Sequence, residues 1–259
     1  MALIVPTELK DFHRTFEKLS YMYDKMDVFD TFLEWIMWGF CADNSMNWDS
    51  GKKYKPEQQA MFLDLFKEWV KVIDKQVNAD GKWYDLFGTY YEAYVASKSR
   101  RDCKGQFFTP PHVCDLMAQI VDGQVGESFN DPCIGSGRFG LAYHTHNIGN
   151  YLYCSDLDRT CCMMSVCNFI VHGCMAEVVW QDSLNPDSWL GGWRVNWNLN
   201  NPFHKYYGVP HVETIQRDDS RAWHLWQAKK AAVEVAPPPI PVIEAPPLKQ
   251  KNELQLTLF

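Results

Sequence analysis

The stretch Ser128-Phe-Asn-Asp-Pro-Cys-Ile-Gly-Ser-Gly-Arg-Phe139 decides the fold of this protein. It begins with a short strand-like segment, residues 128–131, and leads into a helix-like segment after Gly137. Gly135 and Gly137 let the backbone turn tightly and approach a ligand, and the start of a helix favours an anionic group. The stretch has neither the third glycine of a dinucleotide fingerprint nor the Lys-Ser/Thr pair of a P-loop. By itself it indicates a ligand-binding turn between a strand and a helix.

Three further apolar segments follow, and each is expected to form a strand: residues 151–155, 176–180 and 194–199. They are separated by roughly 20 residues, an alternation typical of parallel βαβ units. We predict an α/β fold with a Rossmann-like core and a mostly parallel sheet. In such sheets ligands bind beyond the carboxyl ends of the strands, so the residues that follow each strand form the candidate site.

Two acids stand at these predicted strand ends. Asp156 ends the second strand, where a carboxylate can accept hydrogen bonds from both hydroxyls of a ribose. Asp182 follows the third strand, where it could accept a hydrogen bond from an adenine amino group. Either acid alone is typical of a solvated loop, but their occurrence at successive strand ends favours a nucleoside site.

The chain divides into three predicted parts. Residues 11–98 carry aromatic side chains at helical spacing, such as Phe62, Phe66 and Trp69, which predict amphipathic helices. The proline-rich segment 237–247 lacks the backbone donors that a helix or central strand needs and is expected to be an extended tether. The predicted parts are a helical N-terminal region 1–100, a cofactor-binding core 101–236, and a tether with a terminal interaction peptide 237–259.

The composition is that of a soluble globular chain, with 46% apolar and 15% aromatic residues and a net charge of −7. No apolar run reaches the ~18 residues of a membrane helix, and the N-terminus does not have the pattern of a secretory signal. Cysteines scattered through apolar segments fit a reducing, cytoplasmic location. The closely spaced group Cys161, Cys162, Cys167, His172 and Cys174 contains no CxxC pair, so buried thiols are expected there and no metal.

Further motifs lie before and after the strand-end residues. Taken in chain order, the whole set resembles the motifs of the N6-adenine DNA methyltransferases, especially the modification subunits of type I restriction systems. The resemblance covers about residues 83–203. In chain order, the motifs are Asp85-Leu-Phe-Gly-Thr-Tyr-Tyr-Glu92, Gly105-Gln-Phe-Phe-Thr-Pro110, Asp131-Pro-Cys-Ile-Gly-Ser-Gly137, Asp156, Asp182 and Asn200-Asn-Pro-Phe203.

This resemblance implies a cofactor and a reaction. The cofactor is S-adenosyl-L-methionine, and its methyl group is transferred to the N6 amino group of adenine in DNA. The target is double-stranded DNA whose adenine is flipped out of the helix. The cofactor-binding residues implied are Phe108 and Thr109 at the methionine end, Asp131, Gly135 and Gly137 along the cofactor, Asp156 at the ribose and Asp182 at the adenine amino group.

The resemblance assigns the chemistry to the loop Asn200, Asn201, Pro202 and Phe203. The side-chain oxygen of Asn200 and a neighbouring backbone carbonyl would accept the two amino hydrogens while the nitrogen attacks the sulfonium methyl group. Phe203 would stack on the target base. Positioned acceptors and in-line orientation supply the catalysis, without a covalent enzyme intermediate.

Two departures from the family pattern leave an alternative open. Asn201 replaces a proline, so the loop loses a fixed φ angle and is less preorganised. The chain after Phe203 is also short for this family, which implies an incomplete sheet and a base pocket that a specificity subunit or a second copy would complete. The alternative is a catalytically impaired, methyltransferase-like binding protein associated with DNA or replication.

Two segments suggest macromolecular partners. Lys98, Arg100, Arg101 and Lys104 would contact DNA phosphates, or would form a solvated basic loop. The terminal Gln255-Leu-Thr-Leu-Phe259 resembles the peptide by which bacterial replication and repair proteins bind the DNA polymerase sliding clamp. That resemblance implies that Leu258 and Phe259 enter an apolar pocket while Gln255 forms a hydrogen bond, and the other possibility is a tail that folds back on its own domain. The expected location is a bacterial cytoplasm, or that of a host cell if a phage or mobile element encodes the protein.

Overall fold

The structure, a computed structural model, describes residues 5–80, 82–96, 107–121 and 123–235. By the contacts within the chain, Met1–His224 form one compact unit and Leu225–Phe259 a second. The predicted boundary at residues 100 and 101 and the predicted tether 237–259 lie outside the described residues.

Three long helices form the N-terminal part of the first unit: α1 (Lys10–Ser20), α2 (Lys25–Gly39) and α3 (Pro56–Asp80). Asp24 caps α2, because its side chain accepts hydrogen bonds from the first backbone N–H groups of the helix. Pro56 occupies the first position of α3, where its missing N–H costs nothing. The predicted stripe on α3 faces the core, with Trp69 fully buried.

A short helix leads from this part into the sheet. It is α4 (Leu86–Tyr90), and it continues as a π-helical turn over Tyr91–Val95. Asp85 caps it by accepting a hydrogen bond of 2.7 Å from the backbone N–H of Gly88. After residues 97–106, which are not described, α6 (Pro111–Ile120) precedes the first strand.

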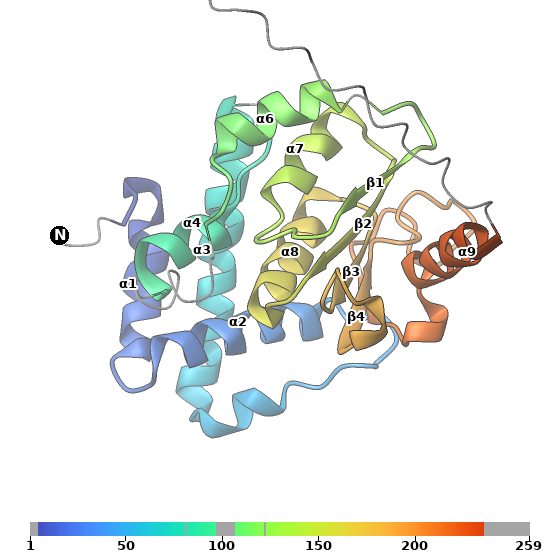
Figure 1. Cartoon of the computed structure of the whole chain (residues 1–259). Coiled ribbons are helices and arrows are strands. Elements are labelled where there is room, and N and C mark those ends of the chain that lie inside the picture. The colour runs from blue at the N-terminus through green and yellow to red at the C-terminus, as the bar shows by residue number, and fades with distance from the viewer. Residues whose placement is uncertain (1–4, 81, 97–106, 122, 236–259) are drawn as a thin grey trace, which may run out of the picture. The chain divides into compact units, whose positions relative to one another are not determined.

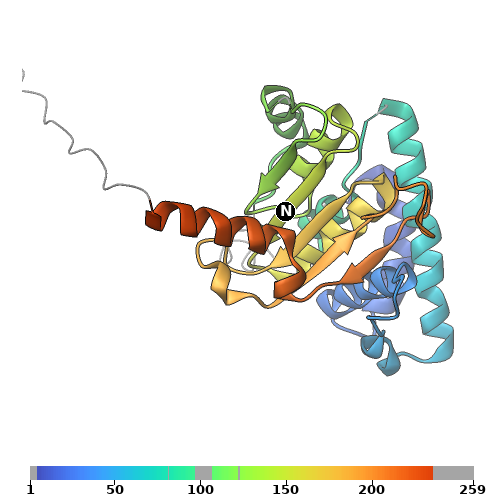
Figure 2. The same cartoon turned by 90° about the vertical axis from the view of Figure 1, so that its right-hand side faces the viewer.

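The sheet has five strands in the order β1-β2-β3-β4-β5. The first three strands are parallel and are joined by α7 (Arg138–His146) and α8 (Arg159–His172), as the alternating pattern predicts. Figure 2 shows the strands side by side. Their bounds are Ser128–Asp131 for β1, Tyr151–Asp156 for β2, Ala176–Trp180 for β3, Gly191–Val195 for β4 and Val212–Thr214 for β5.

The fourth strand corrects the sequence prediction. It covers Gly191–Val195, where residues 194–199 were expected, and it runs antiparallel to β3. The connection from β3, residues 181–190, holds only a 3-10 turn at Pro186–Ser188. A parallel crossover takes about a dozen residues or more, usually with a helix, so this segment can only close a hairpin. The sheet is therefore mixed, and β5 also pairs antiparallel with β4.

The layers stack from the sheet outward. In Figure 1, α7 and α8 lie on one face of the sheet, and the N-terminal helices lie beyond them. A single apolar core runs through these layers, from Leu9 to Val212. The sulfhydryl of Cys167 on α8 reaches the carbonyl of Leu33 on α2, 3.6 Å away. The helical part and the sheet part thus share one interior.

On the opposite face of the sheet, Glu177 is fully buried. Its carboxylate accepts hydrogen bonds from the hydroxyl of Ser220 and from the backbone N–H groups of Arg221 and Ala222. Ser220 directly precedes α9 (Arg221–Val235) and the other two residues begin it, so a buried acid caps the start of that helix. No helix within the described residues is long and apolar enough to span a bilayer.

Candidate functional site

The glycine turn after β1 has the geometry that the sequence predicts. Gly135 and Gly137 have φ angles of +59° and +94°, which side chains rarely adopt. A Cβ on Gly135 would lie 3.0 Å from the ring of Phe108, and one on Gly137 would lie 3.3 Å from the Cα of Ser165. The turn ends at Gly137, and α7 begins with Arg138. Both glycines are therefore required by conformation and by close contacts.

Two carboxylates face this turn from the ends of β1 and β2. Asp156 accepts hydrogen bonds of 2.9 Å from the backbone N–H groups of Gly135 and Asp158. Asp131 accepts one of 3.0 Å from Cys133. Burial raises the pKa of both carboxyls above the ordinary value, and the charge of Asp156 adds to this rise for Asp131. This edge thus has acidic side chains in a partly buried setting, which suits a cationic ligand.

A chain of hydroxyl groups links the ends of the three parallel strands. The hydroxyl of Ser155 lies 2.8 Å from that of Ser183, which donates to the carbonyl of Pro132 at 2.5 Å. Asp182, beside Ser183, accepts a hydrogen bond of 2.9 Å from the N–H of Leu184. Asp131 and Asp156 end β1 and β2, and Asp182 lies in the loop after β3. Each is next to a residue of this hydrogen-bonded chain, so the three acids lie at one edge of the sheet.

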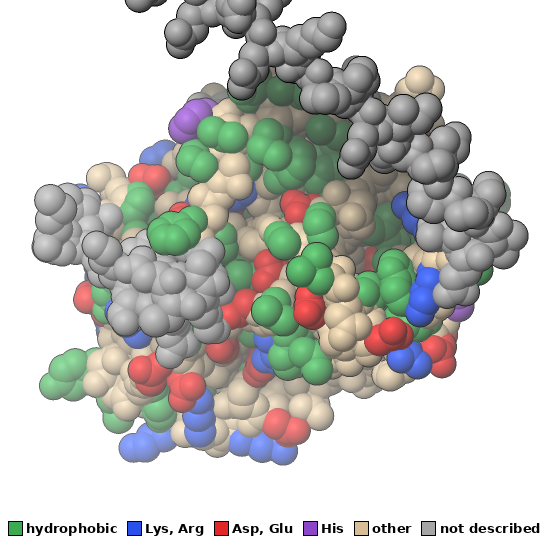
Figure 3. Space-filling model, viewed as in Figure 1, with side chains coloured by type: hydrophobic (Ala, Val, Ile, Leu, Met, Phe, Trp, Pro, Cys, Tyr) green, Lys and Arg blue, Asp and Glu red, His purple; other side chains and the backbone are tan. Residues whose placement is uncertain are grey.

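Apolar side chains that belong to none of the motifs above stand next to two of these acids. Leu157 follows Asp156 and is 68% exposed, and Leu184 is two residues after Asp182 and is 96% exposed. In the view of Figure 3, acidic side chains lie among hydrophobic ones near the middle of the face. Exposed apolar groups beside hydrogen-bond acceptors are suited to a flat heterocycle. The signal available in the sequence was a leucine one residue after Asp156 and two residues after Asp182.

The segment that precedes α6 also reaches the glycine turn. The ring of Phe108 lies against Gly135, and the guanidinium of Arg138 is 5.5 Å from the centre of that ring. The carbonyl of Thr109 lies 3.4 Å from a terminal nitrogen of Arg138. Arg138 is buried between carboxylates of Asp85 and Glu92. Burial acts to lower its pKa, but the two acids outweigh that effect and raise it.

The loop Asn200–Phe203 lies at the opposite edge of the sheet. The side-chain nitrogen of Asn200 is 3.7 Å from the sulfur of Met175, just before β3 begins. The hydroxyl of Tyr151, the first residue of β2, donates to the carbonyl of Trp197. Because β4 is antiparallel, its carboxyl end lies beside the starts of β2 and β3. The expectation that the fourth strand ends at the same edge as the other three is wrong.

Within that loop the side chains are open to solvent. Phe203 is 97% exposed, and its backbone N–H donates to the side-chain oxygen of Asn201 at 3.1 Å. Pro202 is exposed as well. The structure thus brings together Phe108, Thr109, Asp131, Gly135, Gly137, Asp156 and Asp182, and it does not bring Asn200, Asn201, Pro202 and Phe203 to them.

Other predicted residues lie outside the described part of the chain. These are the basic residues Lys98, Arg100, Arg101 and Lys104 and the terminal Gln255, Leu258 and Phe259. Their roles stay predictions.

The cysteine-rich helix α8 is part of the core. Cys161, Cys162, Cys167 and Cys174 are all buried, and burial raises the pKa of the Cys162, Cys167 and Cys174 thiols. Among the described residues, no three His, Cys, Asp or Glu side chains are arranged to hold a metal ion.

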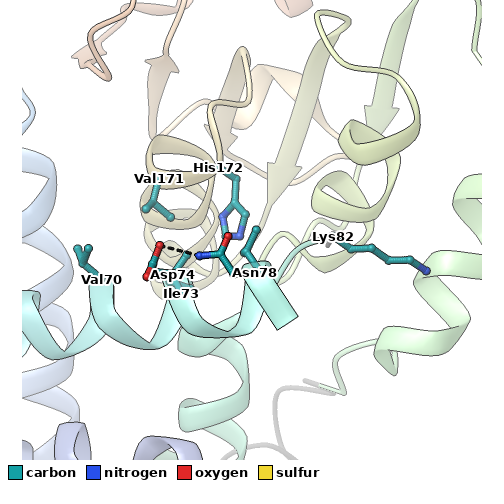
Figure 4. Close-up of a pocket in the computed structure, with 8 residues that line it drawn as sticks. Val70, Ile73, Asp74, Asn78, Lys82, Val171 and His172 are labelled. Carbon is teal, nitrogen blue, oxygen red and sulfur yellow. Dashed lines mark hydrogen bonds between the residues drawn. The ribbon is translucent and has the colours of Figure 1, made fainter. Parts of the chain in front are cut away.

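A separate groove lies between α3 and the end of α8, with a volume of about 380 Å³ (Figure 4). Asn78 donates a hydrogen bond to Asp74 at its rim. His172 lies beside it, but the Nδ1 of its ring contacts the carbonyl of Asn168 and its Nε2 accepts from the N–H of Tyr84. Burial lowers the pKa of His172 to about 4. With both ring nitrogens engaged and the ring neutral, this histidine supports the fold and is not a free base or ligand.

Comparisons with known proteins identify similar chains. Over 129 residues, 46% of this chain and 22% of the other, the chain is 30% identical to the type I restriction enzyme MjaVII methylase subunit of Methanocaldococcus jannaschii. It is 32% identical to the EcoEI methylase subunit of Escherichia coli over 75 residues, 29% of this chain and 15% of the other. A type I restriction-modification methyltransferase subunit of Streptococcus thermophilus aligns with a TM-score of 0.33 and 19% identity, covering 67% of this chain and 38% of that one.

The matched region thus spans less than a quarter of the curated relatives. The sequence profile of the family described as N-6 DNA methylase matches residues 82–234, more than half of the chain and all of the described sheet. The protein belongs to the N-6 DNA methylase family.

Proposed function

We propose that this protein is an S-adenosylmethionine-dependent methyltransferase that acts on the N6 amino group of adenine in DNA. The observation that carries the proposal is the edge formed by the ends of β1, β2 and β3. There, two glycines at positive φ and three strand-end acids lie together. Such an arrangement is suited to an adenosyl ligand.

The proposed contacts follow from the chemistry of each group. Asp156 would accept hydrogen bonds from the ribose hydroxyls and Asp182 one from the adenine amino group, with Leu157 and Leu184 against the ring. Asp131 would lie toward the methionine end, with Phe108, Thr109 and the glycine turn. The cofactor supplies a methyl group activated by its positively charged sulfonium. The acidic side chains at this edge favour that charge.

Methyl transfer needs an acceptor of the amino hydrogens next to the cofactor. In the proposed mechanism Asn200 and a neighbouring backbone carbonyl have this role, and Phe203 stacks on the flipped base. These residues would have to approach the cofactor edge from the far edge of the sheet, through rearrangement of the segment after β3 or through a partner. A specificity subunit or a second copy of the chain would be that partner.

The antiparallel direction of β4 favours a second candidate function. In that case the chain binds S-adenosylmethionine but does not transfer the methyl group by itself, and it acts as a binding protein on DNA. Cofactor binding is common to both candidates, and only methyl transfer separates them.

Two measurements test these proposals. Calorimetry with S-adenosylmethionine is expected to show binding by the full chain and binding weaker by about tenfold or more in Asp156→Ala. Incubation with labelled cofactor and unmethylated genomic DNA then tests transfer, with Asn200→Ala as the matched control. Absence of cofactor binding would reject both candidates. Binding without label transfer would favour the second.

Recruitment to replicating DNA is a further part of the proposal. We infer that Gln255, Leu258 and Phe259 bind the sliding clamp, and that Lys98, Arg100, Arg101 and Lys104 contact DNA phosphates. The full chain is expected to be captured by immobilised clamp, whereas a version ending at Asn252 is not. Equal capture of both versions would reject the clamp peptide. Replacing the four basic residues by glutamine should weaken DNA binding and its dependence on salt.

A further inference from the structure

Beneath the glycine turn, Asp85 and Arg138 form a buried pair that the motif roles above do not use. We propose that this pair is a clasp that positions the Gly135–Gly137 turn and the Phe108–Thr109 segment for the cofactor. What the turn binds rests on the proposed function, whereas the clasp itself rests only on the contacts described below.

Asp85 is the fixed end of the clasp. It is 2% exposed, and its two oxygens accept four hydrogen bonds. One oxygen accepts from the N–H of Gly88 and the side chain of Asn168, both at 2.7 Å. The other accepts from the hydroxyl of Ser136 at 2.5 Å and the Nε of Arg138 at 2.7 Å. Four bonds fill the acceptor positions of a carboxylate, so Asp85 is an anchor and not a ligand.

Arg138 is the part of the clasp that spans several segments. It is 6% exposed. One terminal nitrogen lies 2.9 Å from a carboxylate oxygen of Glu92, and the other lies 3.4 Å from the carbonyl of Thr109. A planar guanidinium can hold several acceptors at fixed angles, whereas an ammonium group cannot. One side chain therefore joins the lead-in helix, the Phe108–Thr109 segment and the start of α7.

The clasp contacts both the glycine turn and the Phe108 segment that packs against it. Ser136 and Arg138 both donate hydrogen bonds to Asp85. They are the two sequence neighbours of Gly137, whose φ is +94°. On the other side Glu92 accepts a hydrogen bond of 3.4 Å from the N–H of Phe108, whose ring lies against Gly135. Movement of the pair would therefore shift the turn and the ring together.

Stability alone does not account for such a pair. Taking two charges out of water costs much of what their attraction returns, and buried apolar residues often serve as well. A network of this kind is better explained by the single arrangement it imposes on the backbone segments it joins. Asp85 and Arg138 are thus positioning residues, since both are buried and their polar atoms are engaged within the chain.

Hydrogen exchange of the full, cofactor-free chain tests the clasp directly. Arg138→Lys keeps the positive charge but removes the planar guanidinium that holds several acceptors at once. Amide exchange in peptides covering 107–114 and 131–141 should therefore become about tenfold faster. Peptides from β2 and β3 should exchange as in the wild type. Arg194→Lys is the matched control, because Arg194 forms a 3.1 Å ion pair with Glu213 away from the turn.

Unchanged exchange in both peptides would overturn the proposal. So would an increase spread evenly over the chain, because that is the result of a merely stabilising role. Glu92→Gln is the second variant and is useful if Arg138→Lys does not fold. Its side chain is 28% exposed, so the fold should tolerate it, and the same two peptides should exchange faster by a smaller factor.

Calorimetry separates the clasp from the proposed function. Arg138→Lys is expected to raise the dissociation constant for S-adenosylmethionine about tenfold, while Arg194→Lys leaves it unchanged. If the wild-type chain does not bind this cofactor, the proposed function fails while the exchange result still decides the clasp. If the wild type and Arg138→Lys bind equally well, the positioning role is rejected.

Discussion

Gly137 shows how a single residue limits what this site tolerates. Its φ is +94°, and the backbone of Ser165 lies 3.3 Å from the position a Cβ would take. Gly126 has a similar φ of +89°, but nothing lies within 4 Å of its Cβ position. The two glycines share a conformation and differ in the space around them.

Substituting each glycine tests how much the close contact of Gly137 with the Ser165 backbone matters for stability. Gly126→Ala should lower the free energy of unfolding by about 1 kcal/mol, from backbone strain alone. Gly137→Ala should lower it by about 2–4 kcal/mol, because the α8 backbone must also move. Urea denaturation measures both. Equal losses would show that the contact with Ser165 has no energetic weight.

The partly buried carboxyl of Asp30 predicts a pH dependence. Burial raises its pKa from 3.8 to about 6, although the Thr160 hydrogen bond and Arg159 act against this shift. The folded chain therefore binds this proton more tightly than the unfolded chain. The resulting stability is fully present below pH 4 and is lost as the pH rises through 6, to a total of about 3 kcal/mol.

Asp30→Asn isolates that contribution. Burial lowers the pKa of His172 to about 4, so its contribution has the opposite sign and is lost as the pH falls from 6.5. The wild type and the variant share the His172 contribution, so the difference between their free energies of unfolding reports Asp30. From pH 5 to pH 7.5 the variant should gain stability relative to the wild type, measured by urea denaturation at each pH. A constant difference would contradict a raised pKa at Asp30.

At the scale of elements, the direction of β4 decides which loops meet. Val195 at the end of β4 pairs with Ala176 at the start of β3. The loop that follows β4 is thereby carried away from the ends of β1, β2 and β3. A parallel β4 would have carried the same residues toward them.

This arrangement predicts different effects of two substitutions on cofactor binding. Asp156→Ala should weaken S-adenosylmethionine binding about tenfold or more, because a carboxylate acceptor is lost. Asn200→Ala should leave the dissociation constant within about twofold, because Asn200 lies at the other edge. Calorimetry on both variants provides the comparison. A loss in Asn200→Ala as large as that in Asp156→Ala would mean that the loop lies beside the cofactor.

At the scale of the first unit, residues 1–224, the helices and the sheet share their core. The ring of Trp69 on α3 lies 5.0 Å from that of Phe87 on α4, and both are fully buried. Phe32 on α2 packs on Phe87 as well, with ring centres 6.1 Å apart. The N-terminal helices therefore support the elements that hold the glycine turn.

A core substitution in α3 should consequently destabilise the whole unit. Trp69→Ala is expected to lower the free energy of unfolding by about 3–5 kcal/mol, while Leu63→Ala, at an exposed position of the same helix, should cost less than about 1 kcal/mol. Helical circular dichroism and the exchange of β2 amides should report one common transition. Separate transitions for helices and sheet would show that the shared core does not couple them.

The sequence by itself determined the local features of this protein. The α/β class, three of the strands and the glycine turn could be predicted, because apolar runs of strand length and glycines at a turn depend on neighbouring residues. The acids Asp131, Asp156 and Asp182 could be placed at one edge because parallel strands joined by helices end on the same side.

Tertiary structure alone decided the rest. The short connection after Trp180 could have indicated a hairpin, but the pairing partner of β4 depends on contacts between distant segments. The clasp of Asp85 and Arg138 joins residues 53 positions apart, and no local pattern specifies such a pair. The direction of one strand and one buried ion pair thus determine which motifs form a common site, because both depend on packing and not on local sequence.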